Sequence, residues 1–322
     1  MKAPHSYANA VAISAQKSLI PKSRLLAAID AKSADEALEL LTATGFGKNA
    51  QISGVGEYEK LVEAETLALR EFIAEYGDSS IEYFCLLKGD FFNCDVAFRH
   101  VRLGVKQSYT GDCITDVAAI EQYVATGKGE VPVYVKDAVA ALDKAQKDGG
   151  TGAELSLASL KSYYAAALKL IKRPFVKSII RVEIDCANIS AYFRSPDRET
   201  AEKQFIDGGK LKKEKLLVLR GSDTAKIRNA FMFSGYKDAI ETCIKAKAEQ
   251  MPLYAFEKIR DDYPMRKLYD NKRYATEGIT PVLLYAAYKR AEIRNFRTVI
   301  SGKLAGAEAE AIVGRLRDGY VG

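Results

Sequence analysis

The chain has 322 residues, of which 48% are hydrophobic and 28% are charged, and it contains no Trp. This balance is that of a globular protein with a sizeable core, which excludes wholesale disorder. The sequence also lacks the run of roughly 18 apolar residues that a membrane-spanning helix needs. The net charge of +6 is uneven, because residues 201–300 carry the basic excess, so this region favours an acidic or anionic partner.

Cysteine usage and the N-terminal segment point to the cytoplasm. The five cysteines are far apart and include no C-x-x-C pair, so we interpret them as small buried side chains in a reducing compartment rather than as a disulfide framework. They are Cys85, Cys94, Cys113, Cys186 and Cys243. The stretch after Lys2 mixes polar and apolar residues, so we expect no signal peptide there.

The first half of the chain is predicted to be helical. Ser33 followed by Glu36 forms a capping box that predicts a helix start, since Ser33 caps free N–H groups while Glu36 reaches back. Apolar residues between Tyr58 and Tyr76 recur at the spacing of one helical face. Loop signals follow at 44–56, 126–132 and 147–152.

The second half is predicted to be helical as well. Residues 179–189 are ambiguous in composition, but their place in the repeat described next favours a helix. Clustered turn residues predict a loop over 260–278. Thr280 followed by Pro281 predicts another helix start, with a hydroxyl cap and a proline in the first turn. Strand signals are few and none pairs through a short turn, so we predict an all-α fold.

A four-residue motif, a small or acidic residue followed three positions later by Asn, recurs four times at spacings of roughly a hundred residues. The copies are Ser6 with Asn9, Asp90 with Asn93, Asp185 with Asn188, and Glu292 with Asn295. An arginine follows three of the copies, at Arg99, Arg194 and Arg297. Because positions i and i+3 share one helix face, we expect these pairs to tie a neighbouring helix or a loop backbone. Four equivalent copies favour a packing role over a catalytic one.

A second element also repeats. The segment 41–46 parallels 231–236, and both segments end helices that are preceded by serine, at Ser33 and Ser222. Gly45 and Gly235 fall where a left-handed helix stop is expected. The two repeats predict three helical units, with domains at 1–105, 106–198 and 199–322.

The sequence offers no candidate active site. No phosphate-binding P-loop or dinucleotide fingerprint is present, and the two histidines, His5 and His100, show no metal-ligand spacing. We interpret the adjacent pair Asp261 and Asp262 as solvated surface carboxylates. We therefore expect no catalytic residue, no cofactor and no metal.

The motifs resemble those of a known family. Segments 285–297, 301–304 and 315–321 are similar to the C-terminal signature of the V/A-type rotary ATPase subunit that is named C in bacteria and archaea and d in eukaryotes. The segment from Asp90 to Asn93 resembles the D-F-x-N element of that family, and Asp185 to Ile189 resembles its D-x-x-N-I copy. Ala12 and Ser14 depart from the family pattern, which tends to carry Arg near these positions.

The resemblance implies three similar helical domains around a pseudo-threefold axis, in a funnel. It implies a non-catalytic central-stalk subunit that couples the axle subunits D and F to the proteolipid rotor ring and transmits torque. The chain would be cytoplasmic, peripheral to the membrane through that ring, and monomeric when isolated.

Two basic clusters are candidates for the surface that contacts a partner. They are Lys210, Lys212, Lys213 and Lys215, and Arg266, Lys267, Lys272 and Arg273. A solvated surface is the alternative interpretation of these clusters. A helical-repeat nucleic-acid binder or scaffold is the alternative function, although interleaved acids argue against nucleic-acid binding. An enzyme with an unrecognised site is a third hypothesis, for which the sequence proposes no nucleophile or base.

Overall fold

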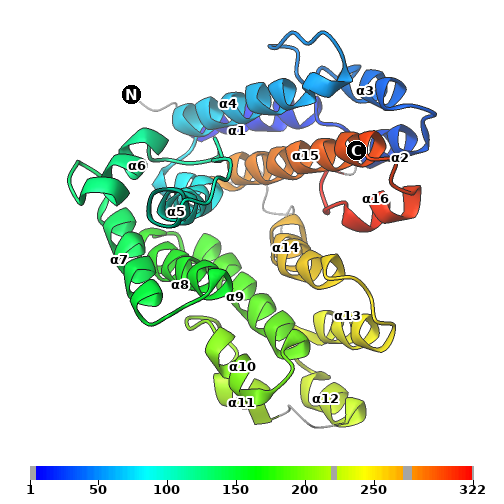
Figure 1. The fold of residues 1–322 in the computed structure, drawn as a ribbon. Coiled ribbons are helices and arrows are strands. Elements are labelled where there is room, and N and C mark those ends of the chain that lie inside the picture. The colour runs from blue at the N-terminus through cyan, green and yellow to red at the C-terminus, as the bar shows by residue number, and fades with distance from the viewer. Residues whose placement is uncertain (1–4, 219–222, 271–277, 321–322) are drawn as a thin grey trace. The chain divides into compact units, whose positions relative to one another are not determined.

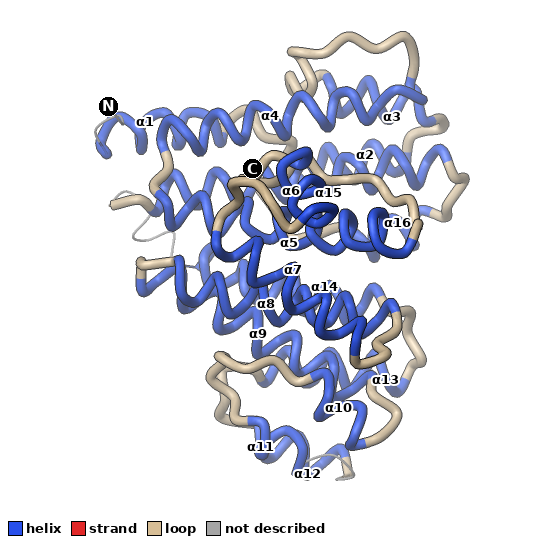
Figure 2. Tube along the Cα trace, turned by 60° about the vertical axis from the view of Figure 1, so that its left-hand side comes forward, coloured by secondary structure: helices blue, strands red, loops and turns tan. Residues whose placement is uncertain are grey.

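The computed structural model describes residues 5–218, 223–270 and 278–320. Within these ranges the chain forms sixteen α-helices and one short 3-10 helix, η1, and it forms no strand. Figure 2 draws the helices in blue. The predicted all-α fold is confirmed. No helix in the described part of the chain is long and apolar enough to cross a membrane.

The chain divides into two compact units, which are residues 1–78 with 221–322, and residues 79–220. The helices of the first unit are α1 (His5–Gln16), α2 (Lys22–Asp30), α3 (Ala34–Thr42), η1 (Val55–Glu57), α4 (Tyr58–Tyr76), α12 (Thr224–Phe231), α13 (Lys237–Ala248), α14 (Tyr254–Tyr269), α15 (Thr280–Leu304) and α16 (Ala309–Arg315). Those of the second unit are α5 (Ser79–Leu103), α6 (Val117–Thr126), α7 (Val133–Lys147), α8 (Gly152–Leu170), α9 (Pro174–Arg194), α10 (Arg198–Gln204) and α11 (Lys213–Val218).

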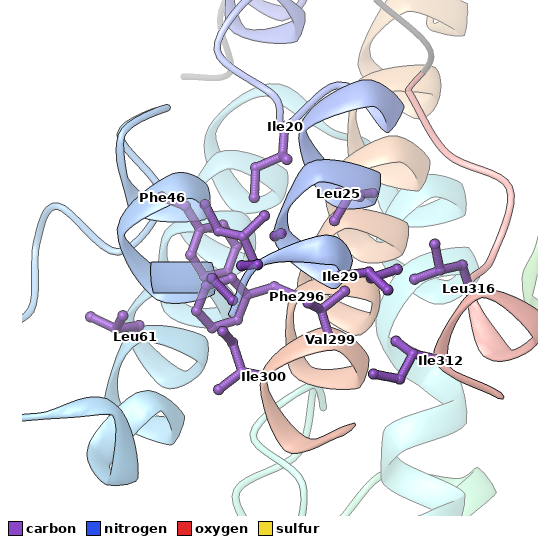
Figure 3. Close-up of a cluster of buried hydrophobic side chains, with 14 of the residues drawn as sticks. Ile20, Leu25, Ile29, Phe46, Leu61, Phe296, Val299, Ile300, Ile312 and Leu316 are labelled. Atoms are coloured by element: carbon purple, nitrogen blue, oxygen red, sulfur yellow. The ribbon is translucent and has the colours of Figure 1, made fainter. Parts of the chain in front are cut away.

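The first unit joins the two ends of the sequence. The long helix α15 packs against α1, α2, α3 and α4, and its orange ribbon lies beside the blue ribbons of these helices in Figure 1. Figure 3 shows the core that this packing creates, in which Phe296 of α15 stacks on Phe46 with 4.1 Å between ring centroids. Leu25, Ile29, Val299 and Ile300 complete the same apolar cluster. Burial of these side chains joins α15 to the N-terminal helices.

The second unit is built on α5 and α8. Helix α8 packs against α5, α7 and α9, while α6 and α7 also pack on α5. The capping box of Thr151 and Glu154 begins α8. Pro174 is the first residue of α9, a position where the backbone N–H has no partner within the helix, so its absence costs nothing. Cys94, Phe98 and Tyr164 are fully buried in this unit.

Several predicted helix boundaries are confirmed. Helix α4 spans Tyr58–Tyr76 as predicted, and the ambiguous segment 179–189 lies inside α9. Ser33 caps α3 by accepting a hydrogen bond from Glu36 N at 3.1 Å, while Glu36 accepts one from Lys32 N at 2.8 Å. The predicted capping box is thus present, with its return bond shifted by one residue.

Two local predictions fail, and a third concerns a residue outside the described part of the chain. The hydroxyl cap expected at Thr280 does not form, because Thr280 is already helical and Ile279 is the capping residue. Gly45 adopts the expected positive φ of 93°, but Gly235 is not among the glycines with positive φ in the described ranges. Helix α12 is capped by Asp223, whose side chain accepts from Lys226 N at 2.8 Å, whereas Ser222 lies outside the described residues.

The loop predicted over 260–278 is wrong in its first half. Helix α14 continues through Pro264 to Tyr269, although a proline inside a helix removes one backbone hydrogen bond. Tertiary contacts override the local turn signals, because Pro264 is buried and the neighbouring aspartates bind the C-terminal segment. Residues 271–277 lie outside the described part.

Candidate functional site

Three motif asparagines bind a loop backbone in the same way. Each side-chain amide both donates to the carbonyl and accepts from the N–H of a single residue. Asn93 binds Thr110 at 3.0 and 2.9 Å, Asn188 binds Ile206 at 2.8 and 2.8 Å, and Asn295 binds Arg317 at 2.9 and 2.8 Å. All three asparagines are buried, and each side-chain amide satisfies both the N–H and the carbonyl of one loop residue.

Two of the motif carboxylates, Asp90 and Asp185, hold the same loops slightly farther along the chain. Asp90 accepts from Ile114 N at 2.6 Å and Thr115 N at 3.0 Å, while Asp185 accepts from Lys210 N and Leu211 N, both at 2.9 Å. The carboxylate lies one turn before the asparagine on its helix, so the loop runs back along that helix. We call each acid–asparagine pair, together with the backbone segments it binds, a backbone clamp.

The third clamp connects the two ends of the chain. Glu292 of α15 accepts a hydrogen bond from Ile20 N at 2.6 Å, and Ile20 lies two residues before α2. Thr115 and Leu211 likewise lie two residues before α6 and α11. The three acids therefore occupy equivalent positions, and we infer that the repeat is permuted, with α15 acting as the motif helix of the N-terminal helices.

The first copy of the motif differs from the other three. Asn9 of α1 donates to the carbonyl of Gly278 at 2.9 Å, just before α15 begins, but its buried oxygen has no hydrogen-bond partner among the residues that the structure describes. Ser6 is exposed rather than buried like the motif acids. Asn9 therefore ties the start of α15 through its bond to Gly278.

Two glycines allow the closest approach of the clamped loops. A Cβ added to Gly89 would lie 1.7 Å from the Asp112 carbonyl oxygen, and one added to Gly209 would lie 2.1 Å from Oδ1 of Asp185. Since neither glycine has a positive φ, it is the absence of a side chain, and not backbone freedom, that matters.

We predict that Gly89→Ala displaces the first clamped loop and destabilises the second unit by about 1–3 kcal/mol, since the added methyl group overlaps backbone atoms. The measurement is the melting temperature. Gly111→Ala is the matched control, because Gly111 lies in the clamped loop that Gly89 of α5 contacts, and a Cβ at Gly111 would meet nothing within 4 Å. Equal melting temperatures for the two variants would contradict the prediction.

The arginines that follow the motif have different contacts. Arg99 pairs with Asp95 at 2.8 Å and donates to the Gly152 carbonyl, which ties α5 to the start of α8. Arg297 binds both carboxylate oxygens of Glu59, the nearer at 2.7 Å, and so links α15 to α4. Arg194 is exposed at the end of α9.

A buried ionic group lies beside the third clamp. Lys289 Nζ lies 2.6 Å from Oε2 of Glu65 and also contacts Glu292, with its side chain only 10% exposed. The other oxygen of Glu65 accepts from Gly47 N at 2.6 Å. Burial alone would lower the pKa of Lys289, but the charges of Glu292 and Glu65 outweigh it and raise that pKa. Sequence reasoning found Glu292 but missed Glu65 and Lys289, because only the fold brings α4 and α15 together.

A second charged group, around the C-terminal segment, corrects the prediction that Asp261 and Asp262 are solvated. Asp261 accepts from Arg294 at 2.8 Å and from Arg317 at 3.0 Å, and Asp262 is buried and accepts from Asp318 N at 3.1 Å. Adjacent residues on a helix do point in different directions, but here both directions are covered by α15 and by residues 316–320.

Burial, together with the neighbouring charge of Asp318, raises the pKa of Asp262 to about 6. Since this pKa is above that of the unfolded chain, the charged form destabilises the fold above pH 6, and the penalty disappears as the pH falls toward 4. We predict that Asp262→Asn stabilises the protein at pH 7.5 by about 1–3 kcal/mol and has no such effect at pH 4.5. Urea unfolding at both pH values measures this difference, and an equal effect at the two values would contradict it.

The candidate partner-contact lysines and arginines fall into both units. Lys210 and Lys212 are exposed beside the second clamp, and Lys213 begins α11 there, followed by the exposed Lys215. Arg266 is exposed on α14 and pairs with Asp318 at 3.1 Å, while Lys267 is half-buried on the same helix. Lys272 and Arg273 lie outside the described residues.

The structure also places the cysteines and His100. All five cysteines are buried, as predicted, and burial raises the pKa of Cys243 to about 12, which disfavours the thiolate. His100 lies at the surface, with Nδ1 3.0 Å from Glu121. Within residues 5–218, 223–270 and 278–320, no group of three or more His, Cys, Asp or Glu side chains could hold a metal ion.

Comparison with known proteins indicates the family of this chain. A search of curated proteins finds no match. Residues 8–315 match the family model described as ATP synthase (C/AC39) subunit. The matched range includes every residue of the three complete clamps except Arg317, which Asn295 binds. Because the match spans nearly the whole chain, this protein belongs to the ATP synthase (C/AC39) subunit family of V/A-type ATPases, as its motifs predicted.

Proposed function

We propose that this chain is the non-catalytic central-stalk subunit that joins the axle subunits D and F to the proteolipid rotor ring and transmits torque between them. The match to the C/AC39 family over residues 8–315 is the observation that carries the proposal. In this role the chain works at the cytoplasmic surface of the membrane, held there by the ring, and is monomeric when isolated.

The clamps support a mechanical role. A torque adaptor must resist bending where its helices are joined, because every loop that yields absorbs part of the rotation. In the first two clamps, buried side chains of one long helix fix the loop that leads into a later helix through several hydrogen bonds. In the third clamp, they hold Ile20 before α2 and Arg317 after α16. Bonds of this kind are costly to break inside a protein.

The three-domain division at 1–105, 106–198 and 199–322 remains a prediction from the repeats, and the funnel around a pseudo-threefold axis remains a prediction from the resemblance. The three complete clamps support a threefold repeat. They also suggest that its boundaries are shifted, since α15 completes the N-terminal unit through Glu292 and Ile20.

Co-expression with subunits D and F tests the proposal. The tagged chain should recover both subunits in equal amounts, and the chain alone should hydrolyse no ATP. Recovery of the chain without D and F, or hydrolysis that persists after repeated purification, would contradict it. Binding to single-stranded RNA at physiological salt would favour the nucleic-acid alternative instead.

We further propose that Lys210, Lys212, Lys213 and Lys215 face the polar loops of the ring. The variant Lys210→Glu with Lys212→Glu should lose binding to the detergent-solubilised ring. Lys136→Glu is the control, because Lys136 is exposed on α7 in the same unit. Unchanged binding of the double variant would assign the lysines to solvent.

A further inference from the structure

The segment that follows α16, residues 316–320, is an extended strap that lies against both α14 and α15. From α15, Asn295 binds the N–H and the carbonyl of Arg317 at 2.8 and 2.9 Å. From α14, Lys258 donates to the carbonyl of Leu316 at 2.7 Å. Because both helices bind its backbone, the strap joins α14 to α15.

Asp318 of the strap is bound by α14 through three of its groups. Its N–H donates to Asp262 at 3.1 Å, its carbonyl accepts from Tyr269 OH at 3.2 Å, and its carboxylate pairs with Arg266 at 3.1 Å. These three partners lie in the second half of α14. The strap therefore holds the C-terminal half of that helix.

Helices α12, α13 and α14 form what we call the arm of the first unit. Helix α12 packs on α13, and α13 packs on α14. Figure 1 shows α14 between α13 and α15. At its N-terminal end α14 lies against α16, where a Cβ added to Gly314 would meet the ring of Tyr254 at 3.0 Å. The strap fastens the arm at the other end of α14.

The strap covers a carboxylate whose charge is poorly compensated. The side chain of Asp262 is 4% exposed, and its Oδ2 is buried with no hydrogen-bond partner in the described part of the chain. Lys258 lies 3.8 Å from this oxygen, beyond hydrogen-bond distance. Burial, and then the charge of Asp318, raise the pKa of Asp262 to about 6 against the opposing charges of Lys258 and Arg317. Closing of the strap over Asp262 therefore favours the protonated acid.

The other ionisable groups around Asp262 keep their charge state near neutral pH. Arg266 pairs with the strap, and Arg294 of α15 binds Asp261. Arginines stay charged in this range, and burial raises the pKa of Tyr269, so its hydroxyl stays neutral. Among these groups, Asp262 is the one whose charge changes close to pH 6.

We propose that residues 316–320 are a releasable strap, which fastens the arm to α15 while Asp262 is protonated and lets it go when Asp262 is charged. The pKa of Asp262 is about 6 under the strap, whereas that of an exposed aspartate is about 4. The equilibrium constant for closing should therefore fall by up to about a hundredfold as the pH rises through 6. The proposal goes beyond the central-stalk role and does not depend on it.

Hydrogen exchange of the full chain at pH 5 and pH 7.5, with rates corrected for the intrinsic effect of pH, tests the strap. Protection of the Arg317 and Asp318 amides should fall about tenfold between these values, because Asp262 loses its proton over this range. In Asp262→Asn, which stays neutral, the protection should be equal at both values.

The amide of Leu211 is the internal control, because Asp185 binds it in the second clamp. Its corrected protection should be the same at pH 5 and pH 7.5. No fall at Arg317 and Asp318, or an equal fall at Leu211 or in Asp262→Asn, would overturn the proposal.

A truncated chain tests whether the strap fastens the arm. A chain that ends at Leu316 keeps α16 but lacks the groups that Asn295 and Asp262 bind. Amides of α13 and α14 should exchange at least tenfold faster, while those of α2 change little, since α15 and α16 hold α2. A chain that ends at Tyr320 is the matched control, because it keeps the whole strap. Unchanged exchange in α14, or the same acceleration in α2, would overturn the proposal.

Discussion

Lys289→Met is expected to destabilise the first unit by about 3–5 kcal/mol, because it leaves two buried carboxylates without their cation. Glu65 and Glu292 have side chains that are 10% and 3% exposed, so solvent cannot replace Lys289. The lysine also lies over the ring of Phe46, 5.1 Å from its centroid, and this contact is lost as well. Urea unfolding followed by circular dichroism measures the loss.

Two further variants test whether charge is the cause. Lys60→Met removes an exposed cation, 56% accessible and paired with Glu57, and should cost less than about 1 kcal/mol. The triple variant Lys289→Met, Glu65→Gln, Glu292→Gln removes all three charges but keeps the oxygens that accept from Gly47 and Ile20. It should recover most of the lost stability. A triple variant no more stable than the single one would contradict this explanation.

Asp90→Ala is the second large expected effect, a loss of about 3–5 kcal/mol from the second unit. The carboxylate accepts from Ile114 N, from Thr115 N and its hydroxyl, and from Tyr134 OH at 2.7 Å, and it is fully buried. Each buried donor left unsatisfied costs about 1–3 kcal/mol.

Hydrogen exchange localises this effect. The amides of Ile114 and Thr115 should exchange much faster in Asp90→Ala, while those of α8 change little. Asp116→Ala is the matched control, since Asp116 caps α6 through one bond of 3.3 Å to Ala119 N and should cost about 1 kcal/mol. If Asp90→Ala cost no more than Asp116→Ala, the clamp would not be a major source of stability.

Sequence periodicity was sufficient for the fold class and for most helices, because it reports local burial. The apolar spacing between Tyr58 and Tyr76 defined α4 to the residue. The repeated asparagine is also evident from the sequence. Asparagine is mildly unfavourable inside a helix, so its recurrence at equivalent positions indicates a structural role.

The contacts made by the motif could not be derived from sequence, because they depend on where loops return. Nothing local shows that Glu292 binds Ile20, which lies 272 residues away. Local signals misled at Asp261, Asp262 and Pro264, where turn-forming residues lie inside α14 and are held by distant partners. Tertiary contacts decided those positions.

The proposed role of this chain, joining the axle to the ring, is tested most directly by reconstitution. Subunits D and F are mixed with the detergent-solubilised proteolipid ring, and co-sedimentation is measured with and without this chain. We predict that D and F sediment with the ring only when the chain is present, with one copy in each complex. Sedimentation of D and F in its absence, or a chain that binds neither component, would contradict this role.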